Sequence, residues 1–242
     1  MMNKRVAFPS TRWTRVAHAS DPHHPRAQAA FAELFQLYWY PMYAFLRFES
    51  GCDHEKAEDL LQAFFLYAYE HRTFGKADRE EVRFRTFVLG RLKNFLIDEY
   101  RHTTAAKRGG SLPHLDIDSL EAEARYAADL ADERFSPEKL FERKLALEIV
   151  NGAMAELESE ATEDGKSAIF AAVRQYLDGE DEGATEGYRA ISVRLNIPVG
   201  TLKSHTHRFR NRLRELLRDC VDQIVASEDD VKSELQALEE AL

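Results

Sequence analysis

The stretch of sequence that decides the fold runs from Gly187 to Leu217 and reads GYRAISVRLNIPVGTLKSHTHRFRNRLRELL. Ile191 and Leu195 recur at helical spacing ahead of Asn196, a residue that tolerates the left-handed conformation in which helices often end. Pro198 then suits the start of a second helix but not the middle of one. The stretch therefore predicts two helices joined by a tight turn.

The second of these helices, from about Thr201, combines an apolar stripe with a basic surface. The stripe comprises Leu202, Phe209, Leu213 and Leu216, and the remaining surface carries Lys203, Ser204, His207, Arg208, Arg210 and Arg214. The whole chain has a formal net charge of -9, so this positive charge is a local concentration. In a DNA-binding helix-turn-helix the second helix enters the major groove. We expect DNA binding here; the alternative is a structural helical hairpin with a solvated basic face.

The rest of the chain extends this helical pattern. A chain of 242 residues, 44% of them hydrophobic, can bury one large or two modest cores, and no β-strand alternation persists along it. We predict an all-α fold of two helical domains joined by an acidic linker, the second domain containing the helix-turn-helix. The expected segments are an N-terminal extension (1–27), a helical domain (28–103), the acidic linker (104–135), the helix-turn-helix domain (136–219) and a C-terminal helical extension (220–242).

Several classes of protein are disfavoured. Cys52 and Cys220 lie far apart, which favours reduced thiols in a cytoplasmic protein over a disulfide framework or a zinc site. No segment approaches the roughly 20 apolar residues of a membrane-spanning helix. The chain has no phosphate-binding Gly-rich loop, HExxH motif or nucleophile elbow. We therefore expect no enzymatic activity, no cofactor, no metal and no membrane insertion.

An acidic amphipathic helix is predicted around EKAEDLLQAFF, residues 55–65. Its apolar face comprises Ala57, Leu60, Leu61 and Phe64. The opposite face presents Glu55, Glu58, Asp59 and Gln62. A basic partner helix is the natural complement of this face, and an ordinary solvated acidic surface is the alternative.

A second basic helix is predicted over VRFRTFVLGRLKNFLIDEYRH, residues 82–102. Phe84, Phe87 or Val88, Leu92 and Phe95 follow the helical period as its core face, and basic side chains including Arg83 and Arg85 lie elsewhere on the circumference. An Asn amide can pair with a base edge, and guanidinium groups can stack on an unstacked base. We expect DNA contacts from Arg91, Lys93, Asn94 and Arg101 before any Phe, with Asp98 orienting Arg101.

The segment YRAISVRLNIPVGTLKSHTHRFRNRLRELL resembles the C-terminal promoter-binding domain of extracytoplasmic-function (ECF) sigma factors of bacterial RNA polymerase. The match includes the start of the recognition helix, Gly200 to Ser204. The resemblance implies that this helix reads the minus-thirty-five promoter element, with contacts from Thr201, Lys203, Ser204, His205, Arg208 and Arg210. His205 is a departure, because the family commonly has Arg there.

The upstream segments LYWYPMYAFLR, EKAEDLLQAFF and FRTFVLGRLKNFLIDEYRH resemble, in that order, the sigma-factor domain that binds the polymerase clamp and opens the minus-ten element. The resemblance assigns the acidic helix to the clamp coiled coil of the largest polymerase subunit and the basic helix to the minus-ten element. Ala63 stands where the family often has Glu. The FPSTRW motif near the start and the extended tail are similar to one sigma subgroup, although this layout is less specific.

The resulting expectation is a sigma factor whose partners are core RNA polymerase and promoter DNA. The alternative is a polymerase-independent helix-turn-helix regulator, which has no need of the acidic helix. An anti-sigma factor or a regulatory kinase is a further candidate partner. The C-terminal extension is expected either to pack on the second domain or to receive a regulator.

Overall fold

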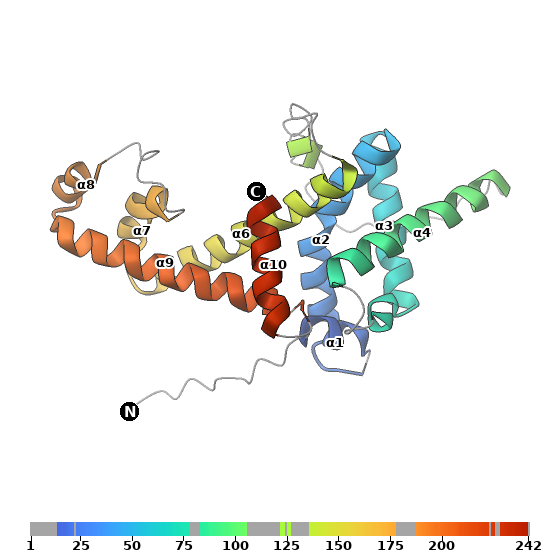
Figure 1. Cartoon of the computed structure of the whole chain (residues 1–242), viewed down its shortest axis with the longest axis horizontal. Helices are drawn as coiled ribbons and strands as arrows, with labels where there is room; N and C mark the ends of the chain where they lie inside the picture. The colour runs from blue at the N-terminus through green and yellow to red at the C-terminus, as the bar shows by residue number, and fades with distance from the viewer. Residues whose placement is uncertain are drawn as a thin grey trace. The chain divides into compact units, whose positions relative to one another are not determined.

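The protein is all-α, as the sequence predicts. The structure, a computed structural model, describes residues 14–21, 23–77, 83–105, 122–123, 125–126, 136–177, 187–222, 224–225 and 228–241, and these contain no strand (Figure 1). The α-helices are α1 (Thr14–Ser20), α2 (Ala27–Ser50), α3 (His54–Glu70), α4 (Phe84–Ala105), α6 (Pro137–Glu163), α7 (Ser167–Val173), α8 (Tyr188–Leu195), α9 (Val199–Asp222) and α10 (Glu228–Ala241). Two 3-10 helices, η1 (Thr73–Lys76) and η2 (Arg174–Tyr176), follow α3 and α7.

The chain forms two compact units. Unit 1 comprises residues 1–147 and 221–242, and unit 2 comprises residues 148–220. The division falls inside α6 and not at residue 136, because the first part of α6 packs into unit 1 through its buried Phe141, which stacks on Tyr38 of α2. The segment expected to link two domains, 104–135, therefore lies in the sequence between two parts of unit 1.

The centre of unit 1 is α2, which is buried all along Tyr38 to Leu46. Because a helix that is apolar all round must be enclosed by other elements, α2 organises its neighbours. Its aromatic side chains make ring contacts with Phe65 of α3, Phe74 of η1, Phe84 of α4 and Phe141 of α6. Such ring pairs add specific geometry to the burial of apolar area.

The C-terminal helix α10 belongs to unit 1, which differs from the first of the two alternatives expected for the tail, packing on the second domain. Val231 and Leu238 of α10 are buried, and Glu234 between them is only 3% exposed. Its carboxylate pairs with Arg85, which is also buried. Arg85 was expected on the basic surface of its helix, but α10 supplies a partner that the pattern of α4 alone does not reveal.

Two described residues of the expected linker, Thr104 and Ala105, end α4, and three further ones, Glu123, Arg125 and Tyr126, contact α2. The Tyr43 hydroxyl donates to the Glu123 carboxylate at 2.6 Å, and Arg47 also donates to that carboxylate. These two hydrogen bonds, from Tyr43 first and then Arg47, hold the pKa of Glu123 below its ordinary value. The Tyr126 ring is buried under the Arg47 guanidinium, at 4.7 Å. The acidic residues Asp116, Asp118 and Glu121 lie outside the described residues.

Unit 2 is built from the second part of α6 together with α7, η2, α8 and α9. Its buried cluster includes Phe170 of α7, Ile191 of α8 and Leu202 of α9, and the rings of Phe170 and Phe209 meet edge to face. Arg212 of α9 forms a two-pronged ion pair with Glu160 of α6, with nitrogen to oxygen distances of 2.9 and 2.7 Å. The apolar stripe of α9 thus faces a core, and its remaining faces are available to solvent.

Replacing Glu234 by Gln is predicted to destabilise unit 1 by about 2 kcal/mol, because the buried Arg85 would lose its α10 carboxylate and keep only the Glu142 carboxylate of α6 at 3.4 Å. Trp39 of α2 is buried in unit 1 and residues 148–220 contain no tryptophan, so tryptophan fluorescence during urea unfolding reports on unit 1 and not on unit 2. The matched control is Glu239→Gln, an exposed change on the same helix that should stay within about 0.5 kcal/mol of the parent. Equal unfolding curves for the two variants would contradict the role of the pair.

Candidate nucleic-acid interface

Two helices joined by a short turn present the basic surface of unit 2. α8 spans Tyr188–Leu195, the bounds expected from the sequence, and Asn196 ends it in the left-handed conformation with φ 53°. The backbone N–H of Asn196 donates to the carbonyl of Val193, and the backbone N–H of Ile197 donates to the carbonyl of Ser192. α9 then begins directly after Pro198. The turn is therefore formed by a helix C-cap followed by a proline, which fixes the directions of the two helices.

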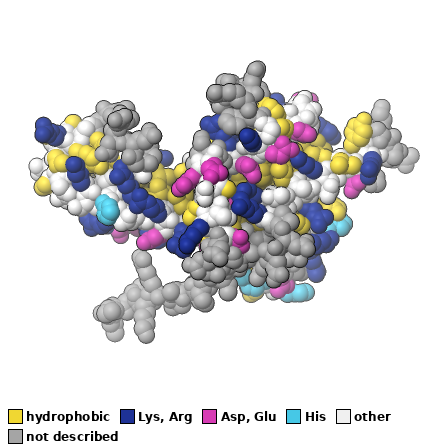
Figure 2. Space-filling model, in the orientation of Figure 1, with side chains coloured by type: hydrophobic (Ala, Val, Ile, Leu, Met, Phe, Trp, Pro, Cys, Tyr) yellow, Lys and Arg dark blue, Asp and Glu magenta, His cyan; other side chains and the backbone are white. Residues whose placement is uncertain are grey.

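The start of α9 exposes most of the side chains expected to contact DNA. Thr201, Lys203, Ser204 and Arg208 are exposed. The Lys203 ammonium lies 5.6 Å from the centre of the Tyr188 ring of α8, and the Arg208 guanidinium donates back to the Ser204 carbonyl at 3.3 Å. Figure 2 shows Lys and Arg side chains over the part of the chain that carries α8 and α9. These groups can reach phosphates or base edges without disturbing the core.

The other two expected residues, His205 and Arg210, are half-buried. Arg210 donates from Nε to the carbonyl of Tyr176 at 2.7 Å, so its side chain ties α9 to η2. Burial, followed by the nearby positive charges of Arg208 and Lys166, lowers the pKa of His205. The lowered pKa disfavours the charged form of His205, so this side chain adds less positive charge to the surface than an unperturbed histidine.

Among the exposed polar residues of α9, Asn211 was not singled out from the sequence, and His207 and Arg214 were placed on the basic surface without an assigned DNA contact. The Asn211 amide lies 3.1 Å from His207 Nε2, and its oxygen accepts a hydrogen bond from Arg214 at 3.1 Å. The three side chains line up at spacings of four and three residues along one exposed face. That spacing was readable in the sequence and extends the candidate DNA surface toward the middle of α9.

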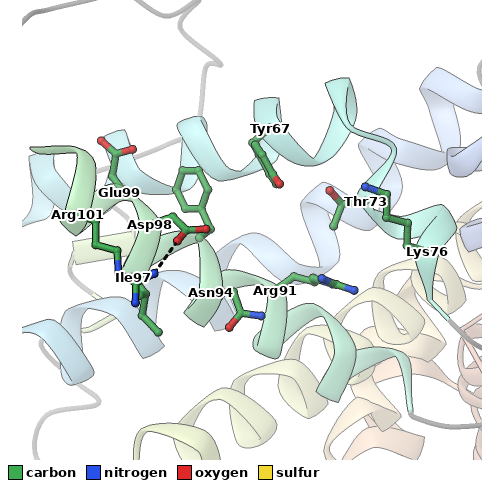
Figure 3. A pocket seen from close by; sticks show the side chains of 10 residues that line it. Tyr67, Thr73, Lys76, Arg91, Asn94, Ile97, Asp98, Glu99 and Arg101 are labelled. Atoms are coloured by element: carbon green, nitrogen blue, oxygen red, sulfur yellow. Dashed lines mark hydrogen bonds and ion pairs between the residues drawn. The ribbon is translucent and has the colours of Figure 1, made fainter. Parts of the chain in front are cut away.

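A second candidate site is a hollow of about 630 Å³ on unit 1, formed by α3, η1 and α4 (Figure 3). Its lining combines aromatic and apolar, cationic, acidic and uncharged polar side chains: Tyr67, Thr73, Lys76, Arg91, Asn94, Phe95, Ile97, Asp98, Glu99 and Arg101. Three of the four residues expected at the minus-ten element are among them. Figure 1 shows the C-terminal end of α4 projecting away from α2 and α3.

The polar groups of the hollow are suited to bind a flat, hydrogen-bonding ligand. Thr73 is 3% exposed, and its hydroxyl has no hydrogen-bond partner among the residues that the structure describes. Figure 3 shows Tyr67 and Thr73 directing their hydroxyl groups into the same space, with the Arg91 and Asn94 side chains on the α4 side. A buried hydroxyl without a partner costs free energy, and a ligand can satisfy it.

Arg101 and Asp98 make the contact expected from the sequence, at 3.4 Å on the exposed end of α4. Tyr67, Thr73 and Lys76 were not assigned. Thr73 and Lys76 sit on η1, a short 3-10 helix between two long helices, where no periodic pattern identifies a functional face. Tyr67 is 41% exposed at the end of α3, beyond the apolar face that the periodicity of that helix indicates.

Lys93 lies apart from the hollow. Its ammonium donates to the Glu138 carboxylate of α6 at 2.6 Å and lies 5.4 Å from the centre of the Phe45 ring of α2. The side chain therefore joins α4 to α6 within unit 1. Its expected role at DNA has no support from this position.

The acidic face of α3 is present on unit 1. The helix begins because the Asp53 side chain caps it, accepting from the Lys56 N–H at 2.9 Å. Glu55 and Asp59 are exposed, whereas Glu58 and Gln62 are half-buried. Glu58 lies 3.5 Å from the His54 ring one turn earlier. Glu55 and Asp59 are thus the members of the set best placed to meet a basic partner.

Comparisons of the chain with family models, with curated protein sequences and with solved structures find no match. No helix in the described part of the chain combines the length and apolarity needed to cross a membrane. The same residues hold no group of three or more His, Cys, Asp or Glu side chains placed for a metal ion. Cys52 and Cys220 are free thiols.

We predict that Lys93→Met raises the pKa of Glu138 toward its ordinary value, because the hydrogen bond from Lys93 is the main cause of its lowered pKa. A carboxylate with a lowered folded-state pKa stabilises the fold above its unfolded pKa, and this contribution is lost as pH falls through the folded value. Carboxyl-carbon NMR titration measures the change, with Arg91→Met as the control on the same helix. An unchanged Glu138 pKa in Lys93→Met would rule out the pairing.

Proposed function

We propose that the protein is a sigma factor that binds core RNA polymerase, directs it to specific promoters and initiates melting of promoter DNA. The observation that carries the proposal is the hollow on unit 1. Arg91, Asn94 and Arg101 were assigned from the sequence to DNA bases that have left the stack, and all three line this one space.

An unstacked base is a ligand that fits the chemistry of the hollow. The Tyr67 ring stacks on His71 at 4.2 Å and directs its hydroxyl toward the hollow (Figure 3), and the Asn94 amide offers both a donor and an acceptor to a base edge. The Thr73 hydroxyl adds a buried hydrogen-bonding group. Lys76, Arg91 and Arg101 supply positive charge for the neighbouring phosphates, offset in part by Asp98 and Glu99. Base-edge contacts here offset the cost of taking a base out of the duplex.

Intact duplex is the ligand proposed for α8 and α9. The exposed side chains at the start of α9 are placed as a recognition helix requires, with Thr201, Lys203 and Ser204 in its first turns and Arg208 one turn later. Arg210 and His205 contribute less than the sequence indicated, because Arg210 ties α9 to η2 and His205 is half-buried with a lowered pKa. Asn211 and Arg214 join the proposed surface.

The acidic face of α3 supports polymerase as the partner of unit 1. Exposed carboxylates on one helix attract a basic partner and set its register. A polymerase-independent regulator could use α8 and α9 in the same way, but it has no need of a site for an unstacked base. The hollow therefore favours the sigma factor over this alternative.

The charge reversal Glu55→Lys with Asp59→Lys is predicted to weaken binding to core polymerase at least tenfold, about 1.4 kcal/mol, because like charges would meet at the interface. Fluorescence anisotropy of the labelled protein titrated with core polymerase measures the affinity. The control Glu239→Lys with Glu240→Lys makes the same change in net charge on the exposed face of α10. Equal affinities for the two double variants would reject α3 as the docking face.

The two proposed DNA sites are predicted to act at different steps. Asn94→Ala and Thr73→Val should reduce permanganate-reactive open complex about tenfold, the size of one lost base contact, while leaving closed-complex affinity unchanged. Lys203→Ala should weaken the closed complex and lower the salt slope of binding by about 0.9, the value for one phosphate contact.

A promoter pre-melted at the minus-ten element separates these effects, because it removes the cost of unstacking. It should partly rescue Asn94→Ala and give no rescue of Lys203→Ala. Equal rescue of both variants would contradict the assignment of strand opening to unit 1 and duplex reading to unit 2.

A further inference from the structure

The wall of the hollow formed by η1 depends on elements outside the hollow. η1 spans only Thr73–Lys76, and a single 3-10 turn has too few hydrogen bonds to hold its own position. Thr73 and Lys76, at its two ends, both line the hollow. The position of this short element therefore decides where the Thr73 hydroxyl and the Lys76 ammonium lie.

η1 is held in place by the buried ring of Phe74 and by the close approach of Gly75 to α1. The Phe74 ring is buried, stacked on Phe31 of α2 at 5.5 Å and edge to face with Phe84 of α4 at 5.6 Å. On its other side, Gly75 meets the last residue of α1. A Cβ atom built on Gly75 would lie 3.0 Å from Ser20 Cβ, closer than side chains normally approach.

The approach of α1 explains why position 75 is a glycine. Gly75 is not among the residues with positive φ, so its backbone conformation is open to alanine. The obstacle is the Ser20 side chain, whose Cβ and Oγ would lie 3.0 and 3.4 Å from the added Cβ, whereas Ser20 Cα would be at an ordinary contact distance of 3.9 Å. A small residue here lets α1 and η1 pack directly against each other.

α1 is itself fixed on α2. Val16 is 1% exposed, and Arg15 forms an ion pair with Glu33 of α2 at 2.9 Å. The Ser20 hydroxyl donates to the Val16 carbonyl at 2.6 Å, which holds the Ser20 side chain against the helix. A chain of contacts thus runs from α2 through α1 to η1 and on to the hollow.

We propose that the N-terminal helix α1 is a positioning element for the hollow, with Ser20 and Gly75 as the contact through which it acts. Within unit 1, α1 packs on α2 and on η1, and η1 carries two lining residues of the hollow. The proposal rests on the proposed function for the nature of the ligand, an unstacked DNA base, and adds a role for a segment that the sequence indicated only as an N-terminal extension.

The test uses the holoenzyme and the most enriched single-stranded DNA from a random pool selected on the wild-type holoenzyme. Gly75→Ala should weaken binding of this DNA about fivefold, as expected when one base contact of about 1 kcal/mol is lost. Adding Ser20→Gly should restore binding to within about twofold of Ser20→Gly alone, since the added methyl group then has room. Affinity for duplex promoter should not change in any of these variants.

If Gly75→Ala only destabilised the protein, it would lower the affinity for both single-stranded and duplex DNA, or the loss would persist when Ser20→Gly is added. Either result would overturn the proposal. If Gly75→Ala does not fold by tryptophan fluorescence, Arg15→Met loosens α1 from α2 without crowding η1. It should weaken single-strand binding while sparing duplex binding, and unchanged single-strand binding would overturn the proposal. A wild-type holoenzyme that binds duplex promoter but selects no single-stranded DNA would overturn both this proposal and the proposed function.

Discussion

The burial of α2 is the constraint on which unit 1 depends. Every residue from Tyr38 to Leu46 is buried, so the helix has no face to offer to water and must be enclosed on all sides. Each large apolar side chain transferred from water contributes about 1.5–3 kcal/mol, which makes this short stretch a dominant source of stability. α1, α3, η1, α4 and the first part of α6 pack around it, and the hollow forms where three of these elements, α3, η1 and α4, meet.

Enclosing a helix that carries tyrosines also buries polar atoms, and charged side chains from distant parts of the chain satisfy some of them. The Tyr43 hydroxyl reaches Glu123 from the expected linker, and burial is the main reason that the Tyr43 pKa is raised. Glu234 of α10 pairs with Arg85 close to the start of α4. A buried ion pair such as Arg85 and Glu234 adds little net stability but penalises any arrangement that separates its members, and the partly exposed Glu123 is held in place by its hydrogen bonds from Tyr43 and Arg47. These contacts therefore specify where the linker segment and the C-terminal helix attach.

The sequence predicted what depends on local periodicity. The all-α class, the bounds of α8, the left-handed Asn196 and the buried faces of α3 and α4 follow from spacing within single helices. The sequence could not show which charged side chains form ion pairs with residues on helices far away in the chain. Arg85 and Lys93 have the same appearance as Arg91 in the sequence, yet the first two are taken up by Glu234 and Glu138. No helical pattern identifies Thr73 either. Its position in the hollow depends on how η1 packs between α1 and the aromatic side chains of α2 and α4.

The proposed function joins two DNA sites of different chemistry in one chain, a basic helix for duplex and a mixed polar and aromatic hollow for a single base. The most direct test of this account is transcription by core RNA polymerase from the same organism, with and without the protein, on a library of random-sequence promoters. The account predicts discrete initiated transcripts that need the protein and whose templates share two upstream elements. DNA binding by the protein without any transcript above the level of core polymerase alone would contradict it.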